Sequence, residues 1–342
     1  MTNYFFISSP LHFFIASNLA ISHSTDKNIA IFITKNRKNC ERYVAAAQYF
    51  STVFQQTYNL PFTDDKKIFR KRRHCFNQIK RIISSHVPDK IFTGNDRRVE
   101  FQYTMYEAQK HNNTLQGVYM DDGAISYLGH KSINKFTHKH IDPLLKKIAY
   151  GLWWDSPLTV GSSKWISSAY LAFPEQAHPL LESKKLIPID HKVFSSALFL
   201  QISSFLTKSY PEKNLCKLKL IICLPCEKFY VNDAKGLESL ASKLSNNYQA
   251  DEIAIKAHPR SKNIALLKET FEGCQFLPAN LGMELLLPKL DQNTNIIGDV
   301  STTLLTTKWL RPDLSVFTVE LNTKTPPALQ RLFESIGITP LA

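Results

Sequence analysis

The chain has 342 residues, more than one hydrophobic core usually organises, so its length favours two domains. Its composition, with 44% hydrophobic and 21% charged residues, excludes the disordered and fibrous classes. The formal net charge of +13 indicates anionic partners, because a positive field concentrates anions.

The first segment, from Tyr4 to Phe14, is apolar but shorter than the roughly 20 residues that a membrane span needs. Polar residues such as Ser8 and His12 interrupt it, and it lacks the basic region and cleavage site of a signal peptide. The six cysteines are too scattered for a disulfide framework and fit a reducing compartment. We therefore expect a cytoplasmic protein.

Short apolar runs alternate with longer segments of helical spacing, which predicts βαβ units and parallel sheets. The first series has strands expected at 4–8, 29–34, 90–93, 115–120 and 166–172. The second series has strands expected at 218–224, 252–257, 274–277, 295–297 and 314–319, with helices at 234–244, 264–272, 282–290 and 302–309. Residues 175–215 show no clear period and are read as the linker. The fold class predicted is α/β, with two doubly wound Rossmann-like domains, 1–190 and 191–342, facing each other across a cleft.

A basic segment runs from Lys66 to Arg81 and holds eight Lys or Arg and no acidic residue. A solvated helix face would explain it, and so would a docking patch for an anionic acceptor or for membrane phosphate groups. No nucleic-acid recognition motif accompanies the segment, so nucleic acid is not expected as a partner.

The first motif is Asp121-Asp122-Gly123, directly after the strand expected to end at Met120. In open α/β sheets ligands bind beyond the carboxyl ends of the strands, so at least one carboxylate should face the cleft. A carboxylate there can act as a general base towards a hydroxyl group. A polar turn closed by an Asp side chain is the structural alternative.

The second motif is His258-Pro259, at the carboxyl end of the strand expected to end at Ala257. A histidine there can donate a proton or hydrogen bond to a leaving phosphate, and Lys256 and Arg260 would add positive field. An ordinary hydrogen-bonded histidine is the alternative. The same dipeptide at His178 follows an irregular stretch and is interpreted as structural.

Two further candidates belong to the second series. Ser301 and Thr302 precede an expected helix, whose N-terminal amides and dipole favour a phosphate, although either residue could simply cap that helix. Glu284 begins the helix expected at 282–290, where a carboxylate often holds ribose hydroxyls; a first-turn complement to the helix dipole is the alternative.

Several motifs are missing from the sequence. It contains no Gly-x-Gly-x-x-Gly, Walker A or His-Glu-x-x-His pattern, which argues against a dinucleotide dehydrogenase, an ATPase and a zincin. Cys223 and Cys226 have CxxC spacing without a second pair, so buried thiols are the preferred interpretation. The absence of an Asp-x-Asp pair favours a nucleoside monophosphate leaving group. We expect neither a metal nor another cofactor.

Taken in order, these residues resemble the bacterial sialyltransferases of the GT-B type, in particular the lipooligosaccharide sialyltransferases of glycosyltransferase family 52 and their polysialyltransferase relatives. Those enzymes share an Asp/Glu-Asp/Glu-Gly motif, then His-Pro, then a Ser/Thr pair, matched here by residues 121–123, 258–259 and 301–302. The segments FISSPLHFFIASNLA, FTGNDRRVEFQY and LFESIGITPL are also similar, so the resemblance spans nearly the whole chain. Some family 52 members carry the base before the first strand of the second domain. The corresponding stretch here, SSALFLQISSFL, has no carboxylate.

The resemblance implies a GT-B fold in which 1–190 is the acceptor-side domain and 191–342 binds the CMP donor. It implies an inverting, metal-independent transfer of sialic acid from CMP-sialic acid to a sugar hydroxyl of a surface glycan, such as lipooligosaccharide, capsule or polysialic acid. The roles it implies are general base for Asp121, with Asp122 as the second candidate, and general acid or phosphate partner for His258. The implied donor contacts are Pro259, Lys256, Glu284, Ser301 and Thr302, and the implied sialyl or acceptor contacts are Ser9, Asn95 and Asp96.

The partners expected are therefore CMP-sialic acid and an anionic glycan or glycolipid acceptor. Peripheral association with the cytoplasmic face of the inner membrane, through Lys66 to Arg81, is a further expectation. Two alternatives stay open: a GT-B transferase with another activated donor, and a non-catalytic polyanion-binding protein.

Overall fold

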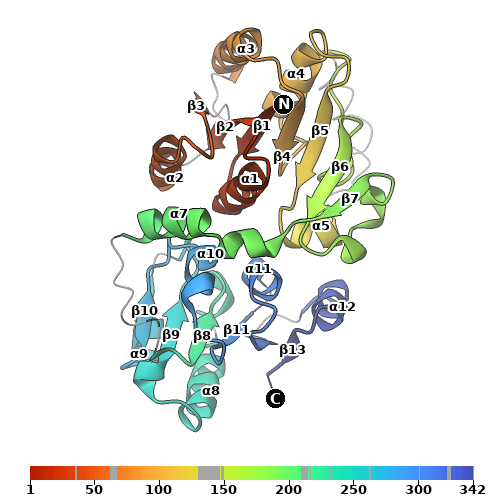
Figure 1. Cartoon of the computed structure of the whole chain (residues 1–342). Coiled ribbons are helices and arrows are strands. Elements are labelled where there is room, and N and C mark those ends of the chain that lie inside the picture. Colours follow the sequence, from red (N-terminus) through yellow and green to blue (C-terminus); the bar gives the residue numbers. More distant parts are fainter. Residues whose placement is uncertain are drawn as a thin grey trace. The chain divides into compact units, whose positions relative to one another are not determined.

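Two parallel sheets, one in each half of the chain, organise the computed structural model of the protein (Figure 1). The structure describes residues 1–34, 37–61, 68–129, 147, 150–208, 215, 217–231, 233–261, 263–299, 301–321 and 325–341. Contacts between residues divide the chain into unit 1, Met1–Ile202, and unit 2, Ser203–Ala342.

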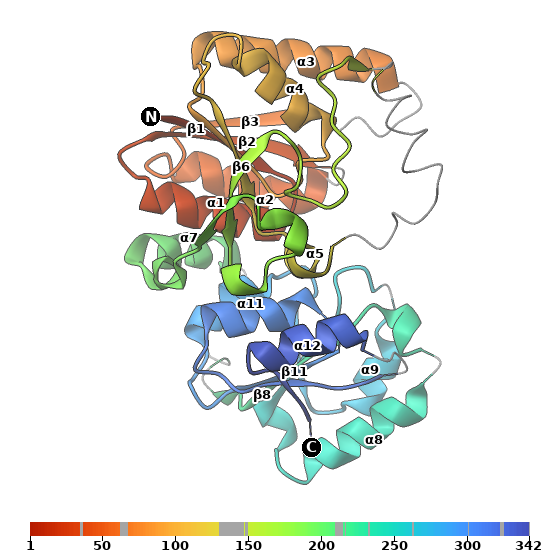
Figure 2. The ribbon, with the colours of Figure 1, turned by 90° about the vertical axis from the view of Figure 1, so that its right-hand side faces the viewer.

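Unit 1 contains a seven-stranded sheet with the order β3-β2-β1-β4-β5-β6-β7. The strands are β1 (Thr2–Ile7), β2 (Lys27–Thr34), β3 (Gln56–Pro61), β4 (Lys90–Thr93), β5 (Gln116–Met120), β6 (Ile166–Leu171) and β7 (Lys185–Pro188). The helices are α1 (Pro10–Ser22), α2 (Arg37–Tyr49), α3 (Ile68–Ser85), α4 (Val99–Ala108), α5 (Ala124–Leu128) and α7 (Ala197–Thr207), the last of which crosses into unit 2. Figure 2 shows α3 and α4 on one side of this sheet and α1 and α2 on the other. Helices on both faces explain why central strands such as β1 are apolar along nearly their whole length.

Unit 2 repeats the plan with six strands in the order β10-β9-β8-β11-β12-β13. Its strands are β8 (Leu220–Cys223), β9 (Ile253–Lys256), β10 (Gln275–Leu277), β11 (Asn295–Gly298), β12 (Val316–Thr318) and β13 (Thr339–Pro340). Its helices are α8 (Ala234–Ser245), α9 (Ala265–Thr270), α10 (Met283–Leu286), α11 (Thr302–Leu310) and α12 (Pro327–Ser335). In both units the strand order reverses beside the first strand, at β1/β4 and at β8/β11, which is the topology of a doubly wound sheet.

The predicted α/β class and the two strand series are confirmed. Three strands without a prediction, β3, β7 and β13, all lie at sheet edges. An edge strand has one neighbour and is partly exposed, so its hydrophobic pattern is weak; β7, for example, has no fully buried residue.

The stretch 175–215, read as an irregular linker, contains β7 and α7, so that prediction is wrong in part. β7 pairs with β6, and Phe199 of α7 packs on Phe14 and Phe194. The division between units falls inside this stretch, between Ile202 and Ser203, whereas the sequence places the boundary at 190 and 191. In the described ranges, no helix has both the length and the apolar composition needed to cross a membrane.

Candidate functional site

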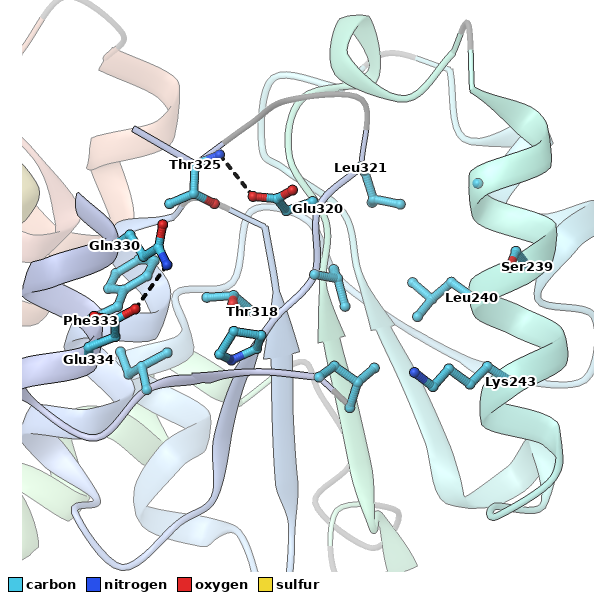
Figure 3. A pocket seen from close by; sticks show the side chains of 15 residues that line it. Ser239, Leu240, Lys243, Thr318, Glu320, Leu321, Thr325, Gln330, Phe333 and Glu334 are labelled. Atoms are coloured by element: carbon cyan, nitrogen blue, oxygen red, sulfur yellow. Dashed lines mark hydrogen bonds between the residues drawn. The ribbon is translucent and has the colours of Figure 1, made fainter. Parts of the chain in front are cut away.

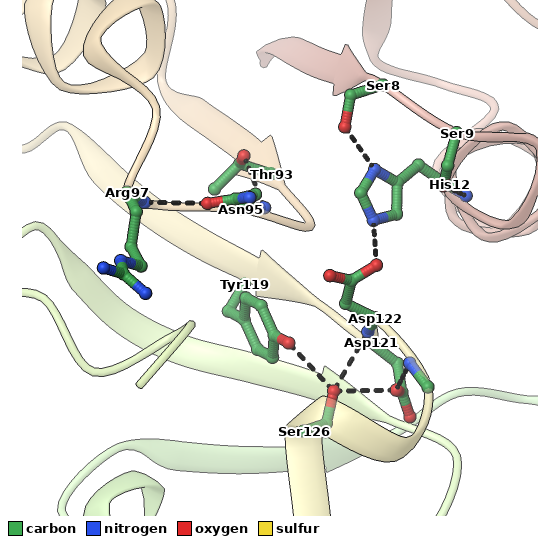
Figure 4. Close-up of polar contacts among 11 residues, drawn as sticks. Ser8, Ser9, His12, Thr93, Asn95, Arg97, Tyr119, Asp121, Asp122 and Ser126 are labelled. Atoms are coloured by element: carbon green, nitrogen blue, oxygen red, sulfur yellow. Dashed lines mark hydrogen bonds and ion pairs between the residues drawn. The ribbon is translucent and has the colours of Figure 1, made fainter. Parts of the chain in front are cut away.

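The carboxyl ends of β1, β4 and β5 lie side by side in the unit 1 sheet, at the point where its strand order reverses. The chain after these strands carries Ser8 and His12, then Gly94 and Asn95, then the pair of aspartates (Figure 4). This edge is where an open α/β sheet binds its ligands.

Asp121 is buried and its carboxylate is fully engaged. Oδ1 accepts hydrogen bonds from the Gly123 amide at 2.7 Å and the Ser126 hydroxyl at 2.9 Å. Oδ2 accepts from the Ala172 amide at 2.9 Å and from the Tyr127 hydroxyl. Burial raises the pKa of Asp121, and the four donors act against that rise. Asp121 therefore ties the turn after β5 to the end of β6.

Asp122 is the carboxylate that reaches solvent, with a side chain 23% exposed. Its Oδ1 lies 2.8 Å from Nε2 of His12, and its amide donates to Ser126 Oγ at 2.9 Å. Its Oδ2 makes no hydrogen bond with any described residue. An acceptor oxygen at a sheet edge with one lone-pair side open is suited to take a proton from a bound hydroxyl.

His12 is a site residue that the sequence reasoning missed. It lies in the first turn of α1, which Ser9 caps by accepting a hydrogen bond from the His12 amide at 3.2 Å. Nδ1 of the ring lies 2.9 Å from Ser8 Oγ. The available signal was the polar pair Ser8 and His12, four residues apart at the junction of β1 and α1. Nothing in the local sequence indicates that Asp122 is the partner of His12.

Ser9 and Asn95 are half-buried residues at this edge, as predicted. Both already serve local structure, Ser9 as the cap of α1 and Asn95 by accepting a hydrogen bond from the Arg97 amide at 3.1 Å. Contact of either residue with a substrate stays a prediction.

Asp96 differs from Ser9 and Asn95 in its solvent exposure, because it is completely buried. Its two oxygens accept from the amides of Gly161 at 2.9 Å and Ser163 at 2.8 Å, and burial raises its pKa. Asp96 therefore anchors the loop before β6. The substrate contact predicted for Asp96 is corrected here, since no surface of the side chain is left for a ligand.

In unit 2, His258 follows β9 and lies half-buried at the carboxyl edge of the second sheet. Nδ1 accepts a hydrogen bond from the Arg260 amide at 3.0 Å, so the neutral ring carries its proton on Nε2. Burial lowers the pKa of His258, and the charges of Arg260 and Lys256 lower it further. The imidazole is thus set to donate one hydrogen bond from Nε2 as a neutral group.

His178 provides an internal comparison, because its Nδ1 accepts from the Leu180 amide at 3.2 Å in the same kind of turn. The His-Pro turn is therefore a local structure and does not by itself indicate a site. His258 differs in following a central strand of a parallel sheet, beside two cationic residues.

Ser301 caps α11, and its Oγ accepts from the Thr303 amide at 3.1 Å. Ser301 and Thr302 are both half-buried, and the Ser301 hydroxyl can still donate its own proton. The N-terminus of α11 follows β11, the neighbour of β8 in the centre of the sheet. The helix dipole makes this end suitable for an anion.

Lys256 and Glu284 lie close enough to influence one another. Lys256 is buried, and its Nζ donates to the Ala279 carbonyl at 2.8 Å, which holds the loop after β10. Glu284, in the first turn of α10, makes no hydrogen bond with the side chain of another described residue. Burial raises the pKa of Glu284 and the charge of Lys256 lowers it. Pro259 is exposed at the surface beside His258.

Cys223 lies beside Lys256 in the sheet, and a pocket lies elsewhere in unit 2. In the described part of the chain no group of three or more His, Cys, Asp or Glu is placed to hold a metal. Burial raises the pKa of the Cys223 thiol to about 12, which describes a buried thiol. A pocket of about 520 Å³ lies between α8, the chain after β12, and α12 (Figure 3). The residues that line it do not include His258, Glu284 or Ser301.

Comparisons with known proteins agree on the fold. The family model described as alpha-2,8-polysialyltransferase (POLYST) matches residues 3–320. An alpha/beta-galactoside alpha-2,3-sialyltransferase from Photobacterium phosphoreum aligns over 99% of this chain and 98% of its own, with a TM-score of 0.61 and 11% identity.

Two further solved structures are similar. A UDP-GlcNAc 2-epimerase from Methanocaldococcus jannaschii covers 100% of this chain and 89% of its own, at a TM-score of 0.59 and 12% identity. A sialyltransferase from Photobacterium damsela aligns over 100% of this chain and 81% of its own, with a TM-score of 0.57 and 14% identity. No curated protein sequence matches. These likenesses confirm the predicted fold of two Rossmann-like units of the GT-B type.

Proposed function

Since the chain belongs to the alpha-2,8-polysialyltransferase family and is a glycosyltransferase, we propose that it transfers sialic acid from CMP-sialic acid to a hydroxyl of an anionic surface glycan. The candidate acceptors are capsule, polysialic acid and lipooligosaccharide. The observation that carries the proposal is Asp122, a partly exposed carboxylate at the sheet edge whose Oδ1 is held by His12 and whose Oδ2 has no hydrogen bond to a described residue.

The proposed reaction is a single displacement with inversion. The acceptor hydroxyl oxygen forms a bond to the anomeric carbon of the sialyl group, and the bond from that carbon to the phosphate oxygen of CMP breaks. The hydroxyl proton passes to Asp122 Oδ2. This assignment shifts the base from Asp121 to Asp122, because all four hydrogen-bonding positions described for the Asp121 carboxylate are filled.

Stabilisation of the leaving CMP is assigned to unit 2. Negative charge develops on the phosphate as the bond breaks, and fixed donors aimed at that charge lower the barrier. His258 would donate from Nε2, and Ser301 and Thr302 would supply hydroxyls at the N-terminus of α11. Glu284 would accept from the ribose hydroxyls, which is supported by the absence of a hydrogen bond from its carboxylate to the side chain of another described residue. Lys256 would contribute positive field. None of these steps uses a metal.

The donor proposal is tested by titration calorimetry of CMP, with UMP and CDP as controls, without added metal. We expect selective CMP binding by the wild type and weaker binding by His258→Ala. Transfer from labelled CMP-sialic acid to a short sialylated acceptor is then measured for wild type and Asp122→Asn. Absence of CMP binding by the wild type would rule out the donor and redirect the search to other activated sugars.

Peripheral membrane association is proposed for the surface around α3. Arg73, Lys80 and Arg81 are exposed on this helix. The Arg72 guanidinium stacks on the ring of Tyr150. Two residues further along the chain, Leu152 is an apolar residue with 86% of its surface exposed. A cationic helix beside an exposed apolar tip fits an anionic lipid surface, where each basic residue contributes about 1 kcal/mol. The part of the basic segment before residue 68, and the side chains up to 71, lie outside the described residues.

Flotation with vesicles containing anionic lipid tests this surface. The double variant Arg73→Glu/Arg81→Glu should lose most binding, and Leu152→Ser should lose part of it. Lys235→Glu, at an exposed position of α8, is the matched control and should bind like the wild type. Equal binding of all four proteins would contradict the proposal.

A further inference from the structure

We propose that His12 is a positioning residue for the transfer reaction, and that Ser8, His12 and Asp122 form one hydrogen-bonded relay that holds the base in place. The inference rests on the proposed function in so far as Asp122 is the base. His12 acts through Asp122 and takes no part in the bonds that form or break.

The contacts fix the protonation pattern of the relay. An ionised carboxylate only accepts hydrogen bonds, so Nε2 of His12, 2.8 Å from Asp122 Oδ1, must carry a proton. In the neutral ring Nδ1 is then an acceptor, and the Ser8 hydroxyl 2.9 Å away donates to it. If the ring takes a second proton, Nδ1 donates to Ser8 Oγ instead. Ser8 fits both states, so Oδ1 of Asp122 always faces a donor.

This arrangement leaves Oδ2 as the oxygen free to receive the acceptor proton. Figure 4 shows the three side chains in line across the ends of β1 and β5. A base whose orientation is set before substrate binds needs less reorganisation in the transition state.

Gly94 supplies the space that the relay needs. A Cβ atom at position 94 would lie 2.1 Å from Nε2 of His12, far inside van der Waals contact. Gly94 does not have a left-handed backbone, so the close approach of the imidazole, and not backbone strain, is what requires glycine here. The ring is also almost fully buried, with 3% of its side chain exposed, so it has little freedom to move elsewhere.

The relay predicts a specific pattern of kinetics. His12→Ala should lower kcat about 10- to 100-fold with little change in KM, because a hydrogen bond to a charged group is lost. His12→Gln should recover at least about fivefold of this loss, since its amide nitrogen can still donate to Oδ1.

A double-mutant cycle tests whether His12 acts through Asp122. In an Asp122→Asn background, His12→Ala should cost less than about twofold more. Additive losses would show that His12 acts independently and would overturn the proposal. An unchanged kcat in His12→Ala, with lower thermal stability alone, would leave His12 a purely structural residue and would also overturn it.

Two variants perturb the relay without removing the imidazole. Gly94→Ala keeps every polar group and displaces the ring, so it should match His12→Ala. Ser8→Ala removes a single hydroxyl and should lower kcat about 3- to 10-fold, as expected for one neutral hydrogen bond. If Gly94→Ala does not fold, Ser8→Ala keeps the proposal testable, and a wild-type kcat in this variant counts against the relay.

Nitrogen-15 NMR of the histidine rings gives a readout independent of activity. The His12 resonance, assigned by its loss in His12→Gln, should show the proton on Nε2, and Nδ1 should respond to Ser8→Ala. A proton on Nδ1 alone would refute the relay even in an active enzyme. If the NMR pattern agrees while the wild type transfers no sialic acid, the proposed function fails and the relay stands.

Discussion

Asparagine at position 121 keeps the size of the side chain but leaves four donors pointing at it. Either orientation of the amide turns its NH2 group towards two of those donors, the pair from Gly123 and Ser126 or the pair from Ala172 and Tyr127. Each unsatisfied buried group costs about 1 to 3 kcal/mol, so the total cost is about 2 to 6 kcal/mol. The low end applies if the hydroxyl of Ser126 rotates to accept from the amide.

That loss should be visible as thermal destabilisation. For a unit of this size about 1 kcal/mol shifts the midpoint by roughly 2 to 4 °C, so Asp121→Asn should unfold about 5 to 20 °C below the wild type. Its kcat, measured well below that midpoint, should stay within about tenfold of the wild type, because the base is still present.

Asp122→Asn should behave in the opposite way. Its side chain is partly solvent-exposed, and among the described residues it accepts one hydrogen bond, from His12, which the amide oxygen can still accept. Stability should change by less than about 1 kcal/mol. Loss of a general base should lower kcat about 100- to 10,000-fold.

Differential scanning calorimetry and initial transfer rates at saturating donor measure both quantities on the same preparations. CMP titration serves as the control, because both substitutions lie in unit 1 and the proposed CMP contacts lie in unit 2. A stable but inactive Asp121→Asn together with an active Asp122→Asn would refute the reasoning. It would return the base to Asp121 and show that the hydrogen bonds around it do not hold the turn.

Four further predictions concern unit 2. His258→Ala should weaken CMP binding about 10- to 100-fold, as expected for a hydrogen bond to a charged group, and His178→Ala should leave it unchanged in the same titration. Because the pKa of His258 is lowered and its Nδ1 accepts from the Arg260 amide, the ring should stay neutral when CMP binds near pH 7. Calorimetry in buffers of different ionisation enthalpy should therefore show the same proton exchange for the wild type and His258→Ala. Glu284→Gln should reduce the preference for CMP over its 2′-deoxy analogue, measured as the ratio of the two dissociation constants. Cys223, with its pKa raised to about 12, should resist iodoacetamide at pH 8 in the native protein and react after unfolding, as read by peptide mass spectrometry.

The sequence determined the fold class, because its apolar runs predicted the central strands that the structure contains. Central strands such as β1, β5, β8 and β9 are buried on both faces, so their apolar letters alone identify them. The edge strands β3 and β7 each pair with only one neighbouring strand of the sheet. Pairing with that neighbour is a long-range event that leaves little trace in composition.

The sequence also determined which turns to inspect. Asp121, Asp122, His258 and Ser301 all follow strand ends, and the order of a doubly wound sheet brings the ends of its central strands to one edge. What it could not determine was the role of each member of the aspartate pair, since the two residues are chemically identical and adjacent.

Only the tertiary structure separated them. Ala172, 51 positions along the chain, donates to Asp121 and helps bury it. His12, 110 positions earlier, binds Asp122, and Gly94 leaves the space for its ring. A carboxylate becomes a structural acceptor or an accessible base according to the donors and solvent around it. Those donors come from strands that meet only when the sheet has formed, which is why the sequence determined the motif and the fold decided its chemistry.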